Sequence, residues 1–192
     1  AHTVVEGPTE IGPDNRISPL ASLGGPPQDK KYGGERSSLT IGSANVIREF
    51  VTVNRGTAGG GAMTVVGNEN LFMAYAHVGH DCTVGSRTVF ANGATLAGHV
   101  EVGDDAIVGA YSAVHQFCRV GRHAITGGCS KIVQDVPPFM IADGNAAEVR
   151  KMGDSRLHVP DPEKEIHRDE NDHERPDVHR NGRKEQLHLG IR

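Results

Sequence analysis

The 192-residue chain has few aromatic side chains, with five Phe, three Tyr and no Trp. A core packed around large rings is therefore excluded, and the 36% of residues that are apolar must supply a core of smaller aliphatic side chains. The chain also contains 25 glycines. Small side chains and frequent glycine favour thin stacked layers over a globule packed around bulky residues.

Other absences narrow the classes of function. Cations are not in excess, since 20 Lys and Arg stand against 24 Asp and Glu, and this argues against a nucleic-acid binder that tracks phosphates. No apolar run approaches the roughly 18 residues of a membrane span, and no leader pattern opens the chain. Three cysteines form an odd set without metal-ligand spacing, typical of a reducing compartment. We therefore expect a cytoplasmic protein with no membrane span and no nucleic-acid partner.

Charge is distributed unevenly along the chain. Residues 151–192 hold 19 of the 44 Asp, Glu, Lys and Arg residues and five of the 11 His, but only eight apolar residues. Such a composition predicts a polar C-terminal tail that is disordered or weakly helical. Residues 1–150 are then expected to form the folded domain.

A six-residue repeat runs through the predicted domain. Every sixth position from residue 66 holds an apolar side chain at eleven of twelve steps: Val66, Phe72, Val78, Val84, Phe90, Leu96, Val102, Val108, Val114, Val120, Thr126 and Ile132. Four residues after each of these positions stands a residue of a second set, which is mostly small and includes Cys82 and Cys118. A Val-Gly pair recurs at every third hexad, so that three hexads make one coil of three short strands. Stacked coils of this kind form a parallel β-helix.

Two insertions interrupt the repeat, at residues 24–38 and 56–63. Loops expelled from a regular solenoid tend to lie on its binding face. The repeat itself does not determine the handedness of the helix. We expect both insertions to project from the β-helix near a functional site.

Polar side chains concentrate at one corner of the predicted prism. Because three hexads close one coil, equivalent turn positions of successive coils stack on one another, and those of one corner hold His77, His80, Asp81, His99, His115 and Gln116. Imidazoles beside a carboxylate are typical of a titrating site, although stacked turn residues can also form a structural ladder. A prism edge is convex and a ligand site is concave. We therefore expect a second copy of the chain to complete the site, most naturally in a trimer.

Five segments resemble the UDP-N-acetylglucosamine 3-O-acyltransferase family of lipid A biosynthesis: ASLGGPPQDKKYGGE (21–35), IREFVTVNRGT (47–57), NLFMAYAHVGHDCTVG (70–85), ANGATLAGHVEVGDDAIVGAYSAVHQFCRVG (91–121) and GGCSKIVQDVPPFMIADGN (127–145). The resemblance covers about residues 1–150. It implies a left-handed parallel β-helix and a homotrimer with active sites between subunits. It also implies transfer of an (R)-3-hydroxyacyl chain from acyl carrier protein to the 3-hydroxyl of UDP-N-acetylglucosamine.

The resemblance further implies a role for individual residues. His80 matches a general base that takes the proton of the sugar hydroxyl, and Asp81 matches the carboxylate that orients this imidazole. The N–H of Gly98 matches an oxyanion donor, and Gly128 matches the position that limits acyl-chain length. Contacts to the sugar nucleotide or the acyl donor are matched by Asp29, Lys31, His77, His99, His115 and Gln116. No metal or cofactor is implied, because the donor is a phosphopantetheine thioester on acyl carrier protein.

Three alternatives remain open. An acetyl-CoA-dependent sugar acetyltransferase of the same fold would explain the repeat and a catalytic histidine, but not the QDKKY loop. A γ-carbonic anhydrase-like enzyme would hold zinc between imidazoles of two subunits, and Asp81 would then have no role. An inactive trimeric scaffold is suggested by departures from the family, since the chain begins some coils late and residues 148–158 lack the family's Gly-Leu-Lys/Arg-Arg segment.

Overall fold

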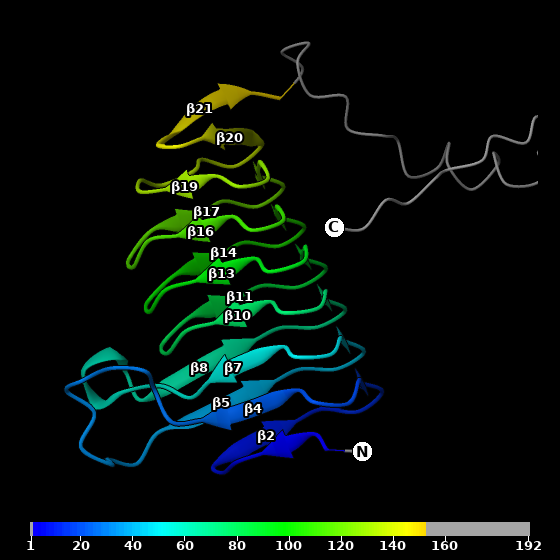
Figure 1. Ribbon diagram of the computed structural model, residues 1–192, viewed down its shortest axis with the longest axis vertical. Coiled ribbons are helices and arrows are strands. Elements are labelled where there is room, and N and C mark those ends of the chain that lie inside the picture. The colour runs from blue at the N-terminus through cyan, green and yellow to red at the C-terminus, as the bar shows by residue number, and fades with distance from the viewer. Residues whose placement is uncertain (1, 153–192) are drawn as a thin grey trace, which may run out of the picture. The chain divides into compact units, whose positions relative to one another are not determined.

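Each six-residue repeat folds into a strand of two residues and a turn of four. The computed structural model describes residues 2–152, and it is a left-handed parallel β-helix whose coils stack along one axis (Figure 1). The predicted fold class is therefore confirmed. The predicted C-terminal tail lies outside the described residues except for residues 151 and 152, so the division at residue 150 stays a prediction. Within the described part, no helix is both long and apolar enough to cross a membrane.

Three sheets form the faces of the prism. Sheet A contains β1 (Val4–Val5), β4 (Ser22–Gly25), β7 (Thr52–Asn54), β10 (His77–Val78), β13 (Thr95–Leu96), β16 (Ala113–Val114) and β19 (Lys131–Ile132). Sheet B contains β2 (Thr9–Ile11), β5 (Ser38–Ile41), β8 (Met63–Val66), β11 (Thr83–Val84), β14 (Glu101–Val102) and β17 (Arg119–Val120). Sheet C contains β3 (Arg16–Ile17), β6 (Val46–Ile47), β9 (Leu71–Phe72), β12 (Val89–Phe90), β15 (Ile107–Val108), β18 (Ile125–Thr126), β20 (Met140–Gly144) and β21 (Ala147–Lys151).

The core is one column of side chains enclosed by the three sheets. The second residue of each short strand points inward, so that Val78, Phe90 and Leu96 have no exposed surface. Small residues fill the corners, where the walls of the prism come closest. Cys82 is one of these, and its burial raises the pKa of the thiol to about 12, as expected of an inert packing residue.

The turns use the left-handed backbone region at one residue in almost every corner. Asp81, His99 and Phe117 have φ values of 58°, 61° and 66°, a conformation that is uncommon outside glycine. Backbone hydrogen bonds between coils stabilise it, for example from the N–H of His99 to the carbonyl of His80 at 2.9 Å. Equivalent turn residues consequently lie in columns that run along the helix.

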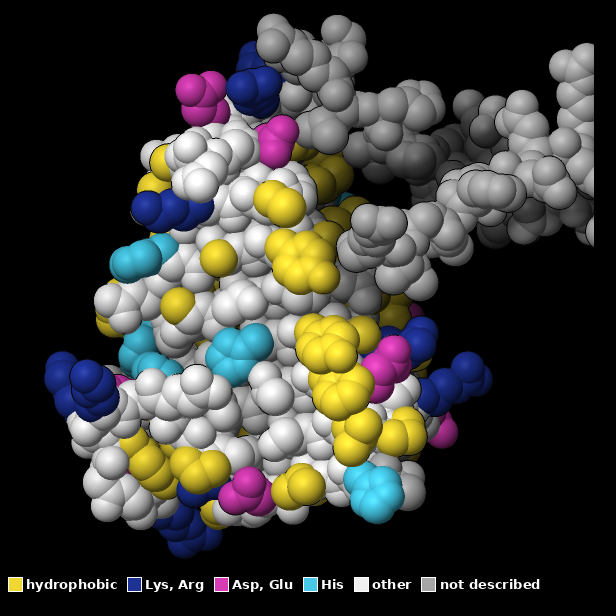
Figure 2. All heavy atoms as spheres, viewed as in Figure 1, with side chains coloured by type: hydrophobic (Ala, Val, Ile, Leu, Met, Phe, Trp, Pro, Cys, Tyr) yellow, Lys and Arg dark blue, Asp and Glu magenta, His cyan; other side chains and the backbone are white. Residues whose placement is uncertain are grey.

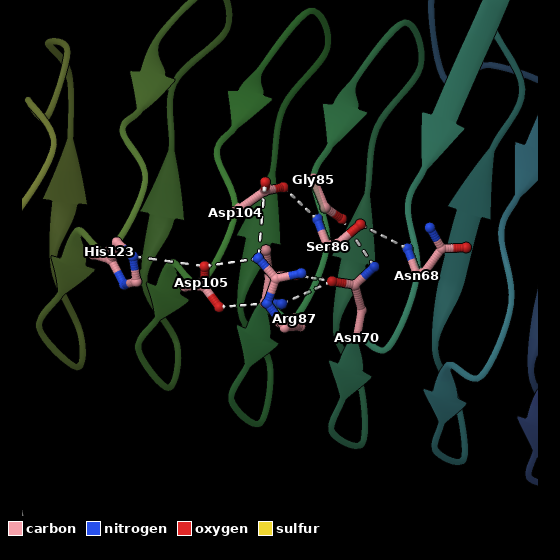
Figure 3. A network of polar contacts seen from close by, with 9 residues as sticks. Asn68, Asn70, Gly85, Ser86, Arg87, Asp104, Asp105 and His123 are labelled. Atoms are coloured by element: carbon pink, nitrogen blue, oxygen red, sulfur yellow. Dashed lines mark hydrogen bonds and ion pairs between the residues drawn. The ribbon is translucent and has the colours of Figure 1, made fainter.

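Polar side chains connect the coils at the corner between sheets B and C (Figure 3). The Oδ1 of buried Asn70 accepts hydrogen bonds from both the N–H and the hydroxyl of Thr88, each at 2.7 Å. Further along the corner, Arg87 binds Asp105 at 2.8 Å, and His123 lies 3.6 Å from the same carboxylate. This column accounts for the polar residues of that corner as structural contacts between coils.

The outward face of sheet C is apolar along most of its length. The first residues of its short strands pair with one another from coil to coil and are all aliphatic from the second coil onward: Val46, Leu71, Val89, Ile107 and Ile125. These side chains are only partly buried. The equivalent outward positions of sheet B include Thr83, Glu101 and Arg119. We call the sheet C column the aliphatic stripe.

The two insertions project from the corner between sheets A and B (Figure 1). The first, residues 26–37, lies between β4 and β5, and the second, residues 55–62, lies between β7 and β8 and includes a 3-10 helix η1 (Ala58–Gly60). We call them the QDKKY loop and the glycine loop. Both leave the β-helix at the corner that carries His80 and His99.

The core and the surface offer a matched stability test, because a pair of stacked aromatic side chains can be compared between them. Phe72 and Phe90 are fully buried and stack at 4.7 Å, whereas the exposed Phe50 and Tyr75 stack at 4.8 Å. Phe90→Ala should lower the free energy of unfolding by about 3–5 kcal/mol through lost burial and a cavity. Tyr75→Ala should lower it by less than about 1 kcal/mol. Urea unfolding measures both, and equal losses would contradict the assignment of the core.

Candidate active site

Three stacked turns between sheets A and B build the site. His80 and Asp81 lie between β10 and β11, His99 lies between β13 and β14, and Phe117 lies between β16 and β17. The rings of His80 and His99 meet edge to face with centroids 5.0 Å apart, and Phe117 stacks on His99 at 4.6 Å. Figure 2 shows histidine side chains together with Lys or Arg side chains at this edge of the molecule.

The QDKKY loop turns this edge into a cleft. A pocket of about 480 Å³ is lined by Gln28, Asp29, Lys30, Lys31, His80, His99, Gln116 and Phe117. The chain's own loop thus forms one wall of the cleft, and the completion of the site by a second copy of the chain stays a prediction. The repeat arithmetic treated the corner as a bare edge and left out the expelled loop.

Arg55 holds the QDKKY loop in place. Its guanidinium donates to the carbonyl of Gly24 at 2.7 Å and to the hydroxyl of Tyr32 at 3.1 Å, and it lies over the Tyr32 ring. Within the loop, the N–H of Lys31 donates to the carboxylate of Asp29 at 2.9 Å. These contacts orient an acidic and a basic side chain toward the same pocket.

His80 and Asp81 form a hydrogen-bonded pair. The Nδ1 of His80 lies 2.7 Å from Oδ2 of Asp81, and the Asp81 side chain has no exposed surface. An ionised carboxylate accepts only, so Nδ1 carries the proton and the Nε2 lone pair remains available. The His80 side chain is 15% exposed and lines the pocket. The pair therefore has the arrangement of a general base with an orienting carboxylate.

Asp81 has further partners in the glycine loop. The N–H of Thr57 donates to Oδ1 at 2.8 Å, and the hydroxyl of Thr57 donates to Oδ2 at 2.7 Å. Ligand atoms of His80, Asp81 and His99 lie within 4.8 Å of one another and could hold a metal ion. Both oxygens of Asp81 are already engaged by donors, however, so this chain offers a metal only imidazole nitrogens at this point. That chemistry fits a proton-transfer pair better than a zinc centre.

Gly98 lies directly under the His80 imidazole. A Cβ atom at position 98 would stand 2.5 Å from Cε1 of that ring, so only glycine allows the ring to pack there. Within residues 2–152, no backbone or side-chain acceptor is in range of the Gly98 N–H. The Gly98 N–H therefore lies next to His80 without a hydrogen-bond partner in this part of the chain.

Five of the ten predicted site residues do not line this pocket: Asp81 and Gly98 lie beside His80, whereas the other three lie farther from it. His77 sits on the outward face of β10, where its Nδ1 is 2.7 Å from the Thr52 hydroxyl, and burial, followed by the positive charge of His80, lowers the pKa of its imidazole. His115 is exposed beside β16, with Nδ1 3.2 Å from the carbonyl of Gln116. Gly128 is exposed, and a Cβ atom there would stand 3.4 Å from the carbonyl oxygen of Ala110. The pocket brings together Asp29, Lys31, His80, His99 and Gln116.

The sequence interpretation missed Thr57 and Phe117. Phe117 stands exactly one coil after His99, so the same arithmetic that grouped the histidines would have placed it in their column. Thr57 belongs to an expelled loop, whose residues do not obey the period. Its only signal was the position of the insertion, which was expected on the binding face.

A second groove of about 490 Å³ lies on sheet B, lined by residues that include Glu101, Arg119, Asp135 and Pro138. Its volume matches that of the first pocket, but its lining contains no imidazole and no buried charged group. Chemistry rather than volume therefore selects the corner between sheets A and B.

Comparisons with known proteins show which proteins the chain resembles. A family model described as bacterial transferase hexapeptide (six repeats) matches residues 63–98. An acyl-[acyl-carrier-protein]–UDP-N-acetylglucosamine O-acyltransferase of Verminephrobacter eiseniae (strain EF01-2) is 57% identical over 147 residues, which are 77% of this chain and 56% of that protein. The chain thus spans about half the length of the curated relatives it matches.

Two solved structures extend the likeness. The UDP-N-acetylglucosamine O-acyltransferase of Moraxella catarrhalis RH4 is 40% identical with a TM-score of 0.79, over 86% of this chain and 66% of that one. The UDP-N-acetylglucosamine acyltransferase of Campylobacter jejuni is 33% identical with a TM-score of 0.68, over 86% of this chain and 80% of that one. The likeness therefore includes both the fold and most of the length of a solved relative.

The lowered pKa of His77 predicts a pH dependence of stability. The unfolded chain binds a proton at this imidazole below about pH 6.5, whereas the folded protein resists it. The free energy of unfolding should consequently fall as the pH drops below about 6.5. His77→Asn should reduce this loss, measured as the change in the urea midpoint between about pH 7.5 and 5.5. The same change in the variant and the wild type would remove His77 as its source.

Proposed function

The chain belongs to the acyl-[acyl-carrier-protein]–UDP-N-acetylglucosamine O-acyltransferase family, and from this premise we propose that it transfers an (R)-3-hydroxyacyl chain from acyl carrier protein to the 3-hydroxyl of UDP-N-acetylglucosamine, as in lipid A biosynthesis. The observation that carries the proposal is the pairing of His80 with buried Asp81 at the wall of a pocket. No cofactor is needed, because the thioester itself is the activated group. The proposal includes a cytoplasmic location, where acyl carrier protein and sugar nucleotides are both available.

His80 acts as the base in this mechanism. Because Nδ1–H is bound to Asp81, Nε2 accepts the proton of the sugar hydroxyl while the oxygen attacks the thioester carbonyl. The carbonyl becomes a tetrahedral oxyanion, to which the Gly98 N–H donates. When the intermediate collapses, the carbon–sulfur bond breaks and the imidazolium returns its proton to the thiolate. Asp81 stabilises the transient imidazolium and keeps its tautomer.

The remaining pocket residues suit a sugar nucleotide. Lys31 supplies a cation for a phosphate, and Asp29 supplies an acceptor for sugar hydroxyls. His99 and Gln116 complete the lining with groups that both donate and accept. An acetyl-CoA-dependent acetyltransferase would use the same base, but the donor length discriminates between the two activities. Transfer from acyl carrier protein thioesters of graded length, with acetyl-CoA as the competing donor, is therefore the experiment that tests the proposal.

We include a homotrimer in the proposal. The aliphatic stripe leaves a continuous apolar face on sheet C of a single chain, and such faces are typical of subunit interfaces. A three-sided prism is suited to packing around a threefold axis. Gly128, His77 and His115 lie outside the pocket of one chain, so roles for them in acyl length or donor binding require a neighbouring subunit beside the pocket.

The base assignment predicts a large and specific loss of rate. His80→Ala removes the proposed proton acceptor, so turnover should fall by roughly 10²–10⁴-fold, the usual worth of general base catalysis. Binding of UDP-N-acetylglucosamine, measured by calorimetry, should change much less because Lys31, His99 and Gln116 remain. Asp81→Asn should reduce turnover more mildly. Full activity in His80→Ala would exclude it as the base.

The interface assignment predicts a change of assembly. Ile107→Glu places a charge in the middle of the aliphatic stripe and should convert the trimer to monomer, since burying an unpaired charge at an interface is costly. Thr83→Glu, the same charge on the outward face of sheet B, should leave the trimer intact. Sedimentation velocity measures both. A wild-type monomer, or a trimer that persists in Ile107→Glu, would contradict the assignment.

A further inference from the structure

Burial of the Asp81 carboxylate is unfavourable unless both of its oxygens accept hydrogen bonds. Its side chain has no exposed surface, and a buried ionised carboxylate is costly without hydrogen bonds to its oxygens. His80 supplies one donor, and Thr57 supplies two. Most of the compensation therefore comes from a residue outside the β-helix repeat.

Thr57 fixes the oxygen on which His80 depends. The Thr57 hydroxyl and the His80 Nδ1 both lie 2.7 Å from the same Oδ2. The Thr57 N–H donates to Oδ1, so both carboxylate oxygens accept a hydrogen bond from Thr57. The carboxylate therefore cannot rotate about its Cβ–Cγ bond without losing a hydrogen bond. The direction in which His80 points is thus coupled to the position of Thr57.

The glycine loop is shaped around this contact. The N–H groups of Gly60 and Ala62 both donate to the carbonyl of Thr57, at 3.1 and 2.8 Å. A Cβ atom at Gly60 would overlap the carboxyl group of Asp81, although the backbone of Gly60 is not in the left-handed region. A Cβ at the neighbouring Gly59 would meet open space. Space for Asp81, rather than backbone freedom, therefore requires glycine at position 60.

We propose that the glycine loop, through Thr57 and Gly60, is the positioning element of the His80–Asp81 pair. This inference rests on the proposed function for its effect on turnover. Thr57 does not line the pocket, so it acts through Asp81 and is a positioning residue. Its hydroxyl and N–H keep the carboxylate charged, aligned and confined to a single orientation, and the imidazole is oriented in turn.

Thr57→Val tests the hydroxyl, because it keeps the shape and the N–H. We expect kcat to fall roughly ten- to hundredfold, the worth of one hydrogen bond to a charged group, with KM for the sugar nucleotide unchanged. The acid limb of the pH profile should move to higher pH, since a carboxylate with one donor fewer stabilises the imidazolium more strongly. Thr57→Ser should restore both.

Thr88→Val is the matched control. Thr88 is also buried, and its hydroxyl donates to Asn70 at the same 2.7 Å, but at a different corner. The Thr88→Val variant should lower the free energy of unfolding while leaving kcat and the pH profile unchanged.

Gly60→Ala and Gly59→Ala form a second pair that does not depend on removing a buried polar group. The methyl group at position 60 must displace either the loop or the Asp81 carboxylate, so kcat should fall at least roughly tenfold. The methyl group at position 59 enters open space, and its variant should retain wild-type kcat. Equal activity in the two variants would overturn the role of Gly60.

A measurement without turnover separates this inference from the proposed function. Titration of the His80 imidazole, followed by NMR of ¹⁵N-labelled histidine, should shift its midpoint in Thr57→Val but not in Thr88→Val. If the wild type transfers no acyl chain and the midpoint still shifts, the function fails and the positioning role stands. If the wild type is active, and both kcat and the midpoint in Thr57→Val match those of Thr88→Val, the positioning role is wrong. If Thr57→Val does not fold, the comparison of Gly60→Ala with Gly59→Ala decides the question, again by kcat and by the midpoint of the His80 titration.

Discussion

Backbone hydrogen bonds between equivalent residues of adjacent coils are the interaction on which the rest of this structure depends. Such short strands could not form a sheet alone, but each pairs with the equivalent strand of the coil before and the coil after it, as in β10, β13 and β16. Similar bonds stabilise most of the left-handed turn residues: the N–H groups of His99 and Phe117 donate to carbonyls of the preceding coil, and that of Asp81 donates to the hydroxyl of Thr64. A side chain at any turn position therefore lies above its equivalent in the next coil. Chemistry on this scaffold is arranged in columns, and the column of Asp81, His99 and Phe117 at the corner between sheets A and B is one of them.

A regular β-helix has no cavity, so the site depends on where the repeat is broken. Both insertions leave the chain between a strand of sheet A and a strand of sheet B. The QDKKY loop adds a wall outside the histidine column, and the glycine loop adds donors behind it. The entropic cost of closing a loop rises only slowly with its length, so the scaffold tolerates such insertions. The column supplies a fixed register, and the loops supply the concavity and the orienting contacts.

The period of the sequence was sufficient to predict the fold and the register of the site, but not its shape. Apolar residues at every sixth position predicted the parallel helix, and the coil of three hexads placed His80 and His99 beside each other. Handedness came from the family resemblance, because the repeat does not encode it. The arithmetic also grouped His77 and His115 with this corner, although His77 lies in a strand and points from the face of sheet A. Contacts made by the expelled loops, such as Thr57 with Asp81, have no periodic signature, and this is why the wall that the QDKKY loop adds to the cleft was not predicted.

The burial of Asp81 helps to distinguish between the functions that the fold alone leaves open, namely an acyltransferase, an inactive scaffold and a zinc enzyme. At the corner between sheets B and C, the carboxylate of Asp105 is partly exposed and pairs with a surface arginine, which is sufficient to connect two coils. Asp81 is enclosed completely and requires three donors from two residues to offset its desolvation. A scaffold without activity gains nothing from this arrangement, since an exposed pair serves the same purpose at lower cost. A zinc ion would find only imidazole nitrogens as ligands here, because both oxygens of Asp81 already accept hydrogen bonds from Thr57 and His80. The arrangement leaves the Nε2 of His80 with a free lone pair at the pocket, as the proposed role of proton acceptor requires.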